Sequence, residues 1–361
     1  MLKGPRVCGI ERATEYNQKP MRVSPRSVLF LSPVPFGESL ALLPTLRAIR
    51  DGFKGSSVTA AASTGTVELF SAYRLADEVV DLGVVEPSRQ GAGPALSALK
   101  RTLKLLTRVH SRKFDLTVDC APRLATQLLA LFAHGKTVAP IVRLPDLVDT
   151  LLGGKHGRRT RMEAASASII RQLELKAPPD TWRFEPGPEV AAKIEETLRK
   201  QGFRGGEPLI VLYSADTAIG GAWPVARFAE VGSRLASNYG VRVVVLDQPY
   251  SSKFTSAIGP SLPKEAIKLR APRALDLVGA LARASLVITD DPAVARFSAR
   301  VGSSSIDIGS GSRKGVGSAG TSQPKKGPAG VRGGVLASAE DVYHVACEQL
   351  QASRTAVLFE Q

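Results

Sequence analysis

Short, wholly apolar runs that alternate with amphipathic stretches constrain the fold of this chain more than any other feature. The first run, residues 28–31 (Val-Leu-Phe-Leu), contains no polar residue, which is typical of a parallel strand covered on both faces. Apolar residues at helical spacing separate it from the runs that follow. This repeated β-α pattern predicts a doubly wound parallel α/β sheet with right-handed crossovers. The expected strands span residues 28–31, 57–61, 78–82, 116–119, 209–213, 241–246, 286–289 and 304–308.

The apolar runs fall into two series, and 361 residues are enough for two domains of ordinary size. Residues 176–180 (Lys-Ala-Pro-Pro-Asp) separate the series and are typical of a linker stiffened by proline. We therefore expect a flexible tail over residues 1–26 and two Rossmann-like domains, 27–180 and 181–361, that face each other across a central cleft. The second domain includes a loop rich in Gly, Ser and Lys over residues 309–334.

Local signals place one tight turn and several helices. Two prolines and Gly37 within residues 32–39 predict a connection that is neither strand nor helix. Pro44 suits the first turn of the next helix, because an N–H at that point would have no helical partner. Ser338 and Asp341 have the spacing of a capping box. The expected helices span residues 66–73, 94–112, 123–133, 160–175 and 338 to about 351.

Composition limits the partners. Lys and Arg total 48 against 33 Asp and Glu, and the net charge of +15 favours nucleotides, phosphorylated sugars or anionic lipid. Nucleic acid is not expected, because only 6% of residues are aromatic and none is interleaved with a basic stretch. Three widely spaced cysteines, without a signal peptide or an apolar run of ~18 residues, predict a cytoplasmic protein with at most peripheral membrane contact. The cationic run at residues 155–161 is either a solvated loop or a site for an anionic acceptor or lipid surface.

Several familiar sites are excluded. No Gly-x-Gly-x-x-Gly follows an expected strand, no Gly-x-Ser-x-Gly elbow is present, and the four histidines are scattered. We therefore expect no dinucleotide cofactor, no hydrolase nucleophile and no metal site. Residues 135–137 (Gly-Lys-Thr) look like the end of a phosphate loop, but Ala130 stands where its first glycine should be, so we regard the match as chance.

Polar residues follow four of the expected strands, at the edge where open α/β sheets bind ligands. Each has a structural alternative. Glu38 is either a general base or a carboxylate placed favourably near a helix N-terminus, and the residues alone favour the second interpretation. Asp290 and Asp291 either bind sugar hydroxyls or cap a helix, and the two glycine-containing loops either hold phosphate or are ordinary connections. The four groups are Glu38; Ser214, Asp216 and Thr217 with Gly220-Gly221; Asp290-Asp291; and the loop 309–315 with Arg313 and Lys314.

Several blocks resemble glycosyltransferase family 9, the ADP-heptose:lipopolysaccharide heptosyltransferases. Residues 36–39 and 43–50 are similar to the family's opening Gly-Asp-x-x-x-x-x-Pro-x-Leu-x-x-x-Lys/Arg. Residues 114–119 resemble its Tyr-Asp-Leu-x-Ile-Asp strand, and residues 223–229 its Trp-Pro-x-x-x-Phe-Ala helix start. Residues 286–302 resemble its Ile-Thr-Asn-Asp-Ser-Gly-x-x-His-x-Ala-x-x-x-Gly segment. The blocks occur in the family's order and cover most of the chain after the tail.

The resemblance implies a GT-B fold, with an acceptor-side N-terminal domain and a C-terminal domain that binds a nucleotide sugar. It implies an inverting, metal-independent transfer of a heptose-like sugar from a nucleotide diphosphate, ADP-linked by preference, to a lipid-linked saccharide of the lipopolysaccharide type. Peripheral contact with the anionic inner face of the cell membrane would accompany such an acceptor. The family's acidic base falls on Glu38. The donor would meet Ser214, Asp216, Thr217, Asp290, Asp291 and Arg296, and the acceptor Gly37, Ser39, Arg158, Arg159 and Arg161.

Some positions depart from the family pattern. Gly221 replaces the lysine before Trp-Pro, Pro292-Ala293 replaces Ser-Gly, and Arg296 replaces histidine. The charge of Arg296, or of Arg313 or Lys314, would stand in for the missing lysine. The alternative is a catalytically silent relative that binds a nucleotide sugar, a glycan precursor or a partner protein.

Overall fold

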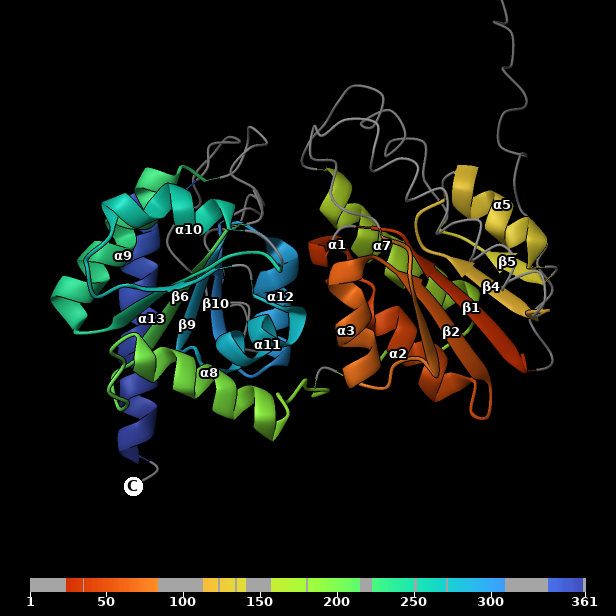
Figure 1. Ribbon diagram of the computed structural model, residues 1–361, viewed down its shortest axis with the longest axis horizontal. Helices are drawn as coiled ribbons and strands as arrows, with labels where there is room; N and C mark the ends of the chain where they lie inside the picture. Colours follow the sequence, from red (N-terminus) through yellow and green to blue (C-terminus); the bar gives the residue numbers. More distant parts are fainter. Residues whose placement is uncertain are drawn as a thin grey trace, which may run out of the picture.

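The computed structural model contains two lobes, each built on one five-stranded sheet in which every pairing is parallel (Figure 1). The doubly wound α/β prediction is therefore confirmed. The predicted tail up to residue 23, the helix at 94–112 and the loop at 309–334 lie outside the described residues. The structure describes residues 24–34, 36–83, 113–122, 124–133, 135–140, 157–179, 181–214, 223–249, 252–270, 272–308 and 337–359.

The elements alternate along the chain as the sequence pattern predicts. Those of the first lobe are β1 (Ser27–Ser32), α1 (Phe36–Leu40), α2 (Leu43–Gly52), β2 (Ser57–Ala62), α3 (Thr64–Ala72), β3 (Glu78–Asp81), β4 (Leu116–Asp119), α5 (Leu124–Phe132), β5 (Lys136–Val138) and α7 (Gly157–Gln172). Those that follow are α8 (Pro188–Lys200), β6 (Leu209–Tyr213), α9 (Val225–Tyr239), β7 (Arg242–Leu246), α10 (Lys253–Ile258), the 3₁₀ turn η1 (Gly259–Ser261), β8 (Ile267–Leu269), α11 (Ala274–Arg283), β9 (Leu286–Thr289), α12 (Pro292–Arg300), β10 (Ser304–Asp307) and α13 (Ala339–Phe359).

The first sheet has the strand order β3-β2-β1-β4-β5. Alternate residues of β1 face opposite layers, so its apolar run is buried on both sides. Val28 and Phe30 pack with residues of α2 and α3, while Leu29 and Leu31 pack with Leu129 of α5. The lobe is therefore a sheet between two helical layers, as a parallel sheet requires.

The second sheet has the order β10-β9-β6-β7-β8 and is covered in the same way. Ile210 and Leu212 of β6 face α9 and α13, which lie side by side on one face (Figure 1). Leu209 and Val211 face the layer formed by α8, α11 and α12. This second layer includes α12, which lies next to α1 of the other lobe.

An aromatic cluster joins the lobes after the predicted linker. Phe184 is 1% exposed, and its ring centroid lies 4.7 Å from that of Tyr73 in the first lobe and 5.2 Å from that of Phe297 in the second. Trp182 packs on the same ring at 4.5 Å. The Phe184 N–H also donates to the carbonyl oxygen of Arg300 at 2.8 Å. The hydrophobic core therefore continues from one lobe into the other, and the domain boundary at residue 180 remains a prediction.

Two strands at the edges of the sheets were not predicted. β5 and β8 are three residues long, and each has a polar residue at its centre, Thr137 and Lys268. Three residues with a polar one at the centre do not form the apolar run on which the prediction depended. Residues 135–137 form no phosphate loop, because Lys136 and Thr137 lie in β5. Gly135 is needed there because a Cβ would collide with the carbonyl oxygen of Phe114.

Two other local predictions were wrong. Residues 36–40 form the short helix α1, because the prolines precede it and leave its own N–H groups intact. The cationic run is no loop from residue 157 onward, because α7 begins at Gly157 and includes Arg158, Arg159 and Arg161 in its first turns. The capping box is confirmed: the Asp341 N–H donates to the Ser338 hydroxyl at 3.1 Å, and Ser338 N–H donates to the Asp341 carboxylate at 3.2 Å.

Candidate functional site

Each sheet has one point at which the strand order reverses, and the predicted site residues follow the strands that meet there. In the first sheet the chain runs outward from β1 through β2 to β3, then returns to β4 on the other side of β1. In the second it runs from β6 through β7 to β8 and returns to β9 beside β6. Open α/β sheets bind ligands at such reversals, beyond the carboxyl ends of the strands. Glu38 follows β1, Ser214 follows β6, and Asp290 and Asp291 follow β9.

The two reversal points meet across the lobes through Gly37 and Asp291. A Cβ built on Gly37 would lie only 2.7 Å from the Oδ2 atom of Asp291, so only glycine lets the two segments approach this closely. The elements that carry them, α1 and α12, pack against each other between the lobes (Figure 1). Glu38 is the next residue after Gly37 and is half-buried in α1. The structure therefore places the predicted base one residue away from the contact with a predicted donor residue.

Asp291 caps helix α12. It is 1% exposed, its Oδ1 accepts a hydrogen bond from the Ala293 N–H at 3.0 Å, and its own N–H donates to the Thr289 hydroxyl at 2.9 Å. Pro292 takes the first helical position, where a missing N–H costs nothing. The capping alternative is thus confirmed for one oxygen of Asp291, while the other faces Gly37.

Asp290 holds two segments of the chain together. Its Oδ2 accepts hydrogen bonds from the Ser214 hydroxyl at 3.0 Å and from the Trp223 N–H at 3.2 Å. Ser214 and Asp290 are both buried, at 2% and 6% exposure. Two residues that the sequence assigned to the donor therefore bind each other. Asp216, Thr217 and Gly221 lie outside the described residues.

Arg296 of α12 forms an ion pair with Glu163 of α7, so its guanidinium links the two lobes. Burial raises the pKa of Glu163, the Arg296 charge opposes this shift, and the carboxylates of Asp307 and Asp291 add to it. Three carboxylates and one guanidinium thus lie near the contact between α12 and the first lobe. The role of Arg296 as a donor ligand remains a prediction, and in this structure its charge is engaged by Glu163.

On the acceptor side, Ser39 is fully buried and its hydroxyl donates to the Val34 carbonyl oxygen at 3.3 Å. It therefore holds the connection after β1 in its folded form. Arg158, Arg159 and Arg161 lie in the first turns of α7, on the chain segment that also carries Glu163. Their assignment to the acceptor remains a prediction.

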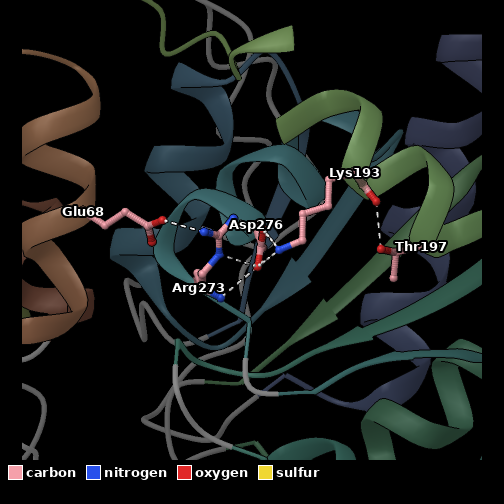
Figure 2. A network of polar contacts seen from close by, with 5 residues as sticks. All are labelled: Glu68, Lys193, Thr197, Arg273 and Asp276. Atoms are coloured by element: carbon pink, nitrogen blue, oxygen red, sulfur yellow. Dashed lines mark hydrogen bonds and ion pairs between the residues drawn. The ribbon is translucent and has the colours of Figure 1, made fainter. Parts of the chain in front are cut away.

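A second polar network joins the lobes through Arg273, the residue before α11 (Figure 2). Its guanidinium lies 3.4 Å from the Glu68 carboxylate on α3 of the first lobe and 3.3 Å from Asp276 on its own helix. Lys193 of α8 donates to Asp276 at 2.8 Å, and Thr197 donates to the Lys193 carbonyl oxygen at 2.8 Å. Sequence reasoning missed Glu68, Arg273 and Glu163, because an ion pair between distant segments leaves no local pattern in the sequence.

Within the described part of the chain, no group of three or more His, Cys, Asp or Glu side chains is arranged to hold a metal ion. None of the helices in that part combines the length and apolar character required to cross a membrane.

Solved structures share this architecture. One titled glycosyl transferase family 9, from Veillonella parvula, superimposes with a TM-score of 0.60 at 15% identity, over 78% of this chain and 80% of that one. The Escherichia coli ADP-heptose LPS heptosyltransferase II gives a TM-score of 0.59 at 13% identity, over 91% and 99%. E. coli heptosyltransferase WaaC with ADP gives 0.56 at 16%, over 90% and 98%. No protein-family model matches the sequence, and no curated protein matches it.

At sequence identities of 13–16%, the structural similarity establishes the fold alone. The chain has the two-lobed GT-B fold, and the structures it resembles include those of glycosyltransferase family 9 and the ADP-heptose heptosyltransferases. The fold expected from the sequence resemblance is therefore confirmed.

Proposed function

We propose that this protein is a glycosyltransferase that moves a sugar from a nucleotide diphosphate donor to a saccharide hydroxyl. The proposal rests on one observation: the backbone next to Glu38 in the first lobe lies against Asp291 in the second. A base on the first lobe and a sugar donor bound to the second would therefore lie close enough to react with one acceptor hydroxyl. The GT-B fold supports the proposal, and one structure with this fold is described with ADP.

In the proposed reaction the Glu38 carboxylate takes the proton of the acceptor hydroxyl. The acceptor oxygen forms a bond to the anomeric carbon while the bond from that carbon to the diphosphate oxygen breaks. Attack from the face opposite the leaving group inverts the anomeric configuration. Glu38 is half-buried in α1. General base catalysis requires a carboxylate within hydrogen-bond reach of the hydroxyl it deprotonates.

The donor would lie on the second lobe, at the reversal between β6 and β9. Asp291 would meet sugar hydroxyls, and the chain after Ser214, with Asp216 and Thr217, would meet the diphosphate. The positive end of the α12 dipole and the Arg296 guanidinium would stabilise the charge that develops on the leaving diphosphate, without a metal ion.

The finer parts of the proposal come from the family resemblance. They are an ADP-linked heptose-like donor, a lipid-linked saccharide acceptor of the lipopolysaccharide type, and a cytoplasmic location with peripheral contact at the inner face of the membrane. Gly37, Ser39, Arg158, Arg159 and Arg161 would lie on the acceptor side. The strongly basic composition is compatible with a phosphorylated acceptor and an anionic membrane surface.

A thermal-shift panel of ADP-, UDP- and GDP-sugars tests the donor. Stabilisation by one of them, followed by release of the nucleotide diphosphate when an acceptor is added, is the expected result. Glu38→Gln should then lower kcat by about 10²–10⁴-fold, the usual contribution of a general base. Glu78→Gln, at the start of edge strand β3, is the matched control. Binding without release of the diphosphate would favour the catalytically silent alternative instead.

A further inference from the structure

One carboxylate oxygen fixes both ends of the connection between β6 and α9. Ser214 is the residue after β6, and Trp223 stands two residues before the start of α9. The Ser214 hydroxyl and the Trp223 N–H both donate to Oδ2 of Asp290, at 3.0 and 3.2 Å. The same atom therefore holds the residue that follows β6 and the residue that precedes α9 by two positions.

All three residues are buried. Asp290 is 6% exposed, Ser214 2% and Trp223 1%. A buried carboxylate is costly unless its oxygens accept hydrogen bonds, so the two donors and the acceptor stabilise one another. We call Ser214, Asp290 and Trp223, with the two hydrogen bonds, the Asp290 bridge.

The Asp290 bridge lies at the ligand-binding edge of the second sheet. Tyr213 at the end of β6 pairs in register with Thr289 at the end of β9, and the bridge joins the residues that come next on each strand. This is where the strand order of the second sheet reverses. Ligands of open α/β sheets bind beyond such a reversal.

We propose that Asp290 is a positioning residue for the donor site. It acts through Ser214 and Trp223, whose places at the ends of the β6–α9 connection it fixes. The sequence assigned Asp290 directly to the donor, and the bridge gives it a different task. This inference rests on the proposed function, because it takes the ligand at this edge to be a nucleotide diphosphate.

Trp223 also connects the Asp290 bridge to the chain segment that precedes α13. Its indole Nε1–H donates to the Ala337 carbonyl oxygen at 2.7 Å, and the Arg227 guanidinium donates to the same oxygen at 3.3 Å. Ala337 stands just before Ser338, which caps α13. The ring of Trp223 also packs edge-on against Phe228 with centroids 4.8 Å apart. Asp290 therefore helps to hold a tryptophan that itself fixes the start of the terminal helix.

Asp247 offers a matched control at the same edge of the sheet. It follows β7 and is fully buried. Its two oxygens accept hydrogen bonds from the N–H of Thr255 at 2.9 Å and from the hydroxyl of Thr255 at 2.6 Å. Both of its donors thus belong to one residue of α10, and it joins no two distant segments. Removing either carboxylate leaves buried donors unpaired, so the two losses of stability should be similar.

The experiment measures the Kd of ADP, UDP and GDP for the full chain by calorimetry. For a nucleotide that binds the wild type, Asp290→Ala should raise the Kd by about tenfold or more, and Asp247→Ala by less than about twofold. Asp290→Asn keeps one acceptor oxygen and should fall between the wild type and Asp290→Ala. Should Asp290→Ala not fold, Ser214→Ala removes one donor only and should still weaken binding. Equal Kd values for the Asp290 and Asp247 variants would overturn the proposal.

Hydrogen exchange at the Trp223 amide separates this inference from the proposed function. If none of the three nucleotides binds the wild type, the proposed function fails, but exchange can still be measured. Faster exchange at Trp223 in Asp290→Ala, with no change in Asp247→Ala, is expected if Asp290 fixes the end of the connection. Unchanged exchange in both variants would show that Asp290 positions nothing.

Discussion

Gly37 of the first lobe and Asp291 of the second are in direct contact, and a methyl group on Gly37 would lie 2.7 Å from the Asp291 Oδ2 atom. Both residues are held in place by the structure around them. Asp291 is buried and holds the first turn of α12, and Gly37 lies within α1. The separation of the lobes at the candidate site is therefore set by the absence of a side chain at position 37.

Gly37→Ala should force the lobes apart at this contact. Overpacking a well-packed contact typically costs about 1–3 kcal/mol, and we expect a loss of unfolding free energy in this range. We also expect weaker transferase activity, because Glu38 would move away from the donor side. Urea unfolding and nucleotide diphosphate release measure the two effects.

Gly65→Ala on α3 is the control for this substitution. The new methyl group would find Phe36 at 3.6 Å, which is an ordinary contact, and alanine is the better helix former. The control should be neutral or slightly stabilising. A Gly37→Ala variant that behaves like Gly65→Ala would mean that the close approach of the lobes has no consequence.

Residue patterns predicted the parts of the fold that depend on neighbours along the chain. β4, β6 and β9 were predicted to the residue. In β6 and β9 an apolar run is followed at once by polar residues, which marks where the strand ends. β5 and β8 were missed, since each is only three residues long and has a polar residue at its centre. The pairing of Glu163 with Arg296 was not predictable either, because it depends on how the two lobes meet.

For the candidate site, too, the sequence predicted what depends on local patterns and missed what depends on contacts between distant segments. The topology of parallel sheets was enough to place Glu38, Ser214, Asp290 and Asp291 at ligand-binding edges. It could not show that Asp290 accepts hydrogen bonds from Ser214 and Trp223, because that contact joins residues 67 positions apart or more. Sequence spacing thus located the site, while the task of each carboxylate depended on tertiary contacts.

Glu163 should make the stability of the protein depend on pH. Burial raises its pKa above the ordinary value of 4.5, Asp307 and Asp291 add to this, and Arg296 opposes it. The folded state therefore holds the proton more tightly than the unfolded state does. The contribution of Glu163 to the free energy of unfolding is fully present below pH 4.5, and it is lost as the pH rises through the pKa of Glu163 in the folded state.

Glu163→Gln removes this titration. Urea unfolding at several pH values should show that the stability of the wild type, relative to the variant, falls as the pH rises above 4.5. Glu189→Gln changes the charge equally at an exposed position on α8, and its difference from the wild type should not follow that trend. A wild-type advantage over Glu163→Gln that grew with pH would contradict the direction of the shift.

Phe184→Ala should uncouple the lobes. The Phe184 ring is buried between Tyr73 and Phe297, one from each lobe, and truncating a buried phenylalanine costs about 3–5 kcal/mol. Phe254, 3% exposed, packs on Phe228 within the second lobe alone, so Phe254→Ala should cost a similar amount. Only Phe184→Ala should increase the radius of gyration in solution scattering and split urea unfolding into two transitions, because it removes a side chain from the core that both lobes share. If both variants keep the wild-type radius and a single transition, the polar contacts of Arg273, Arg296 and Asp291 are enough to hold the lobes together.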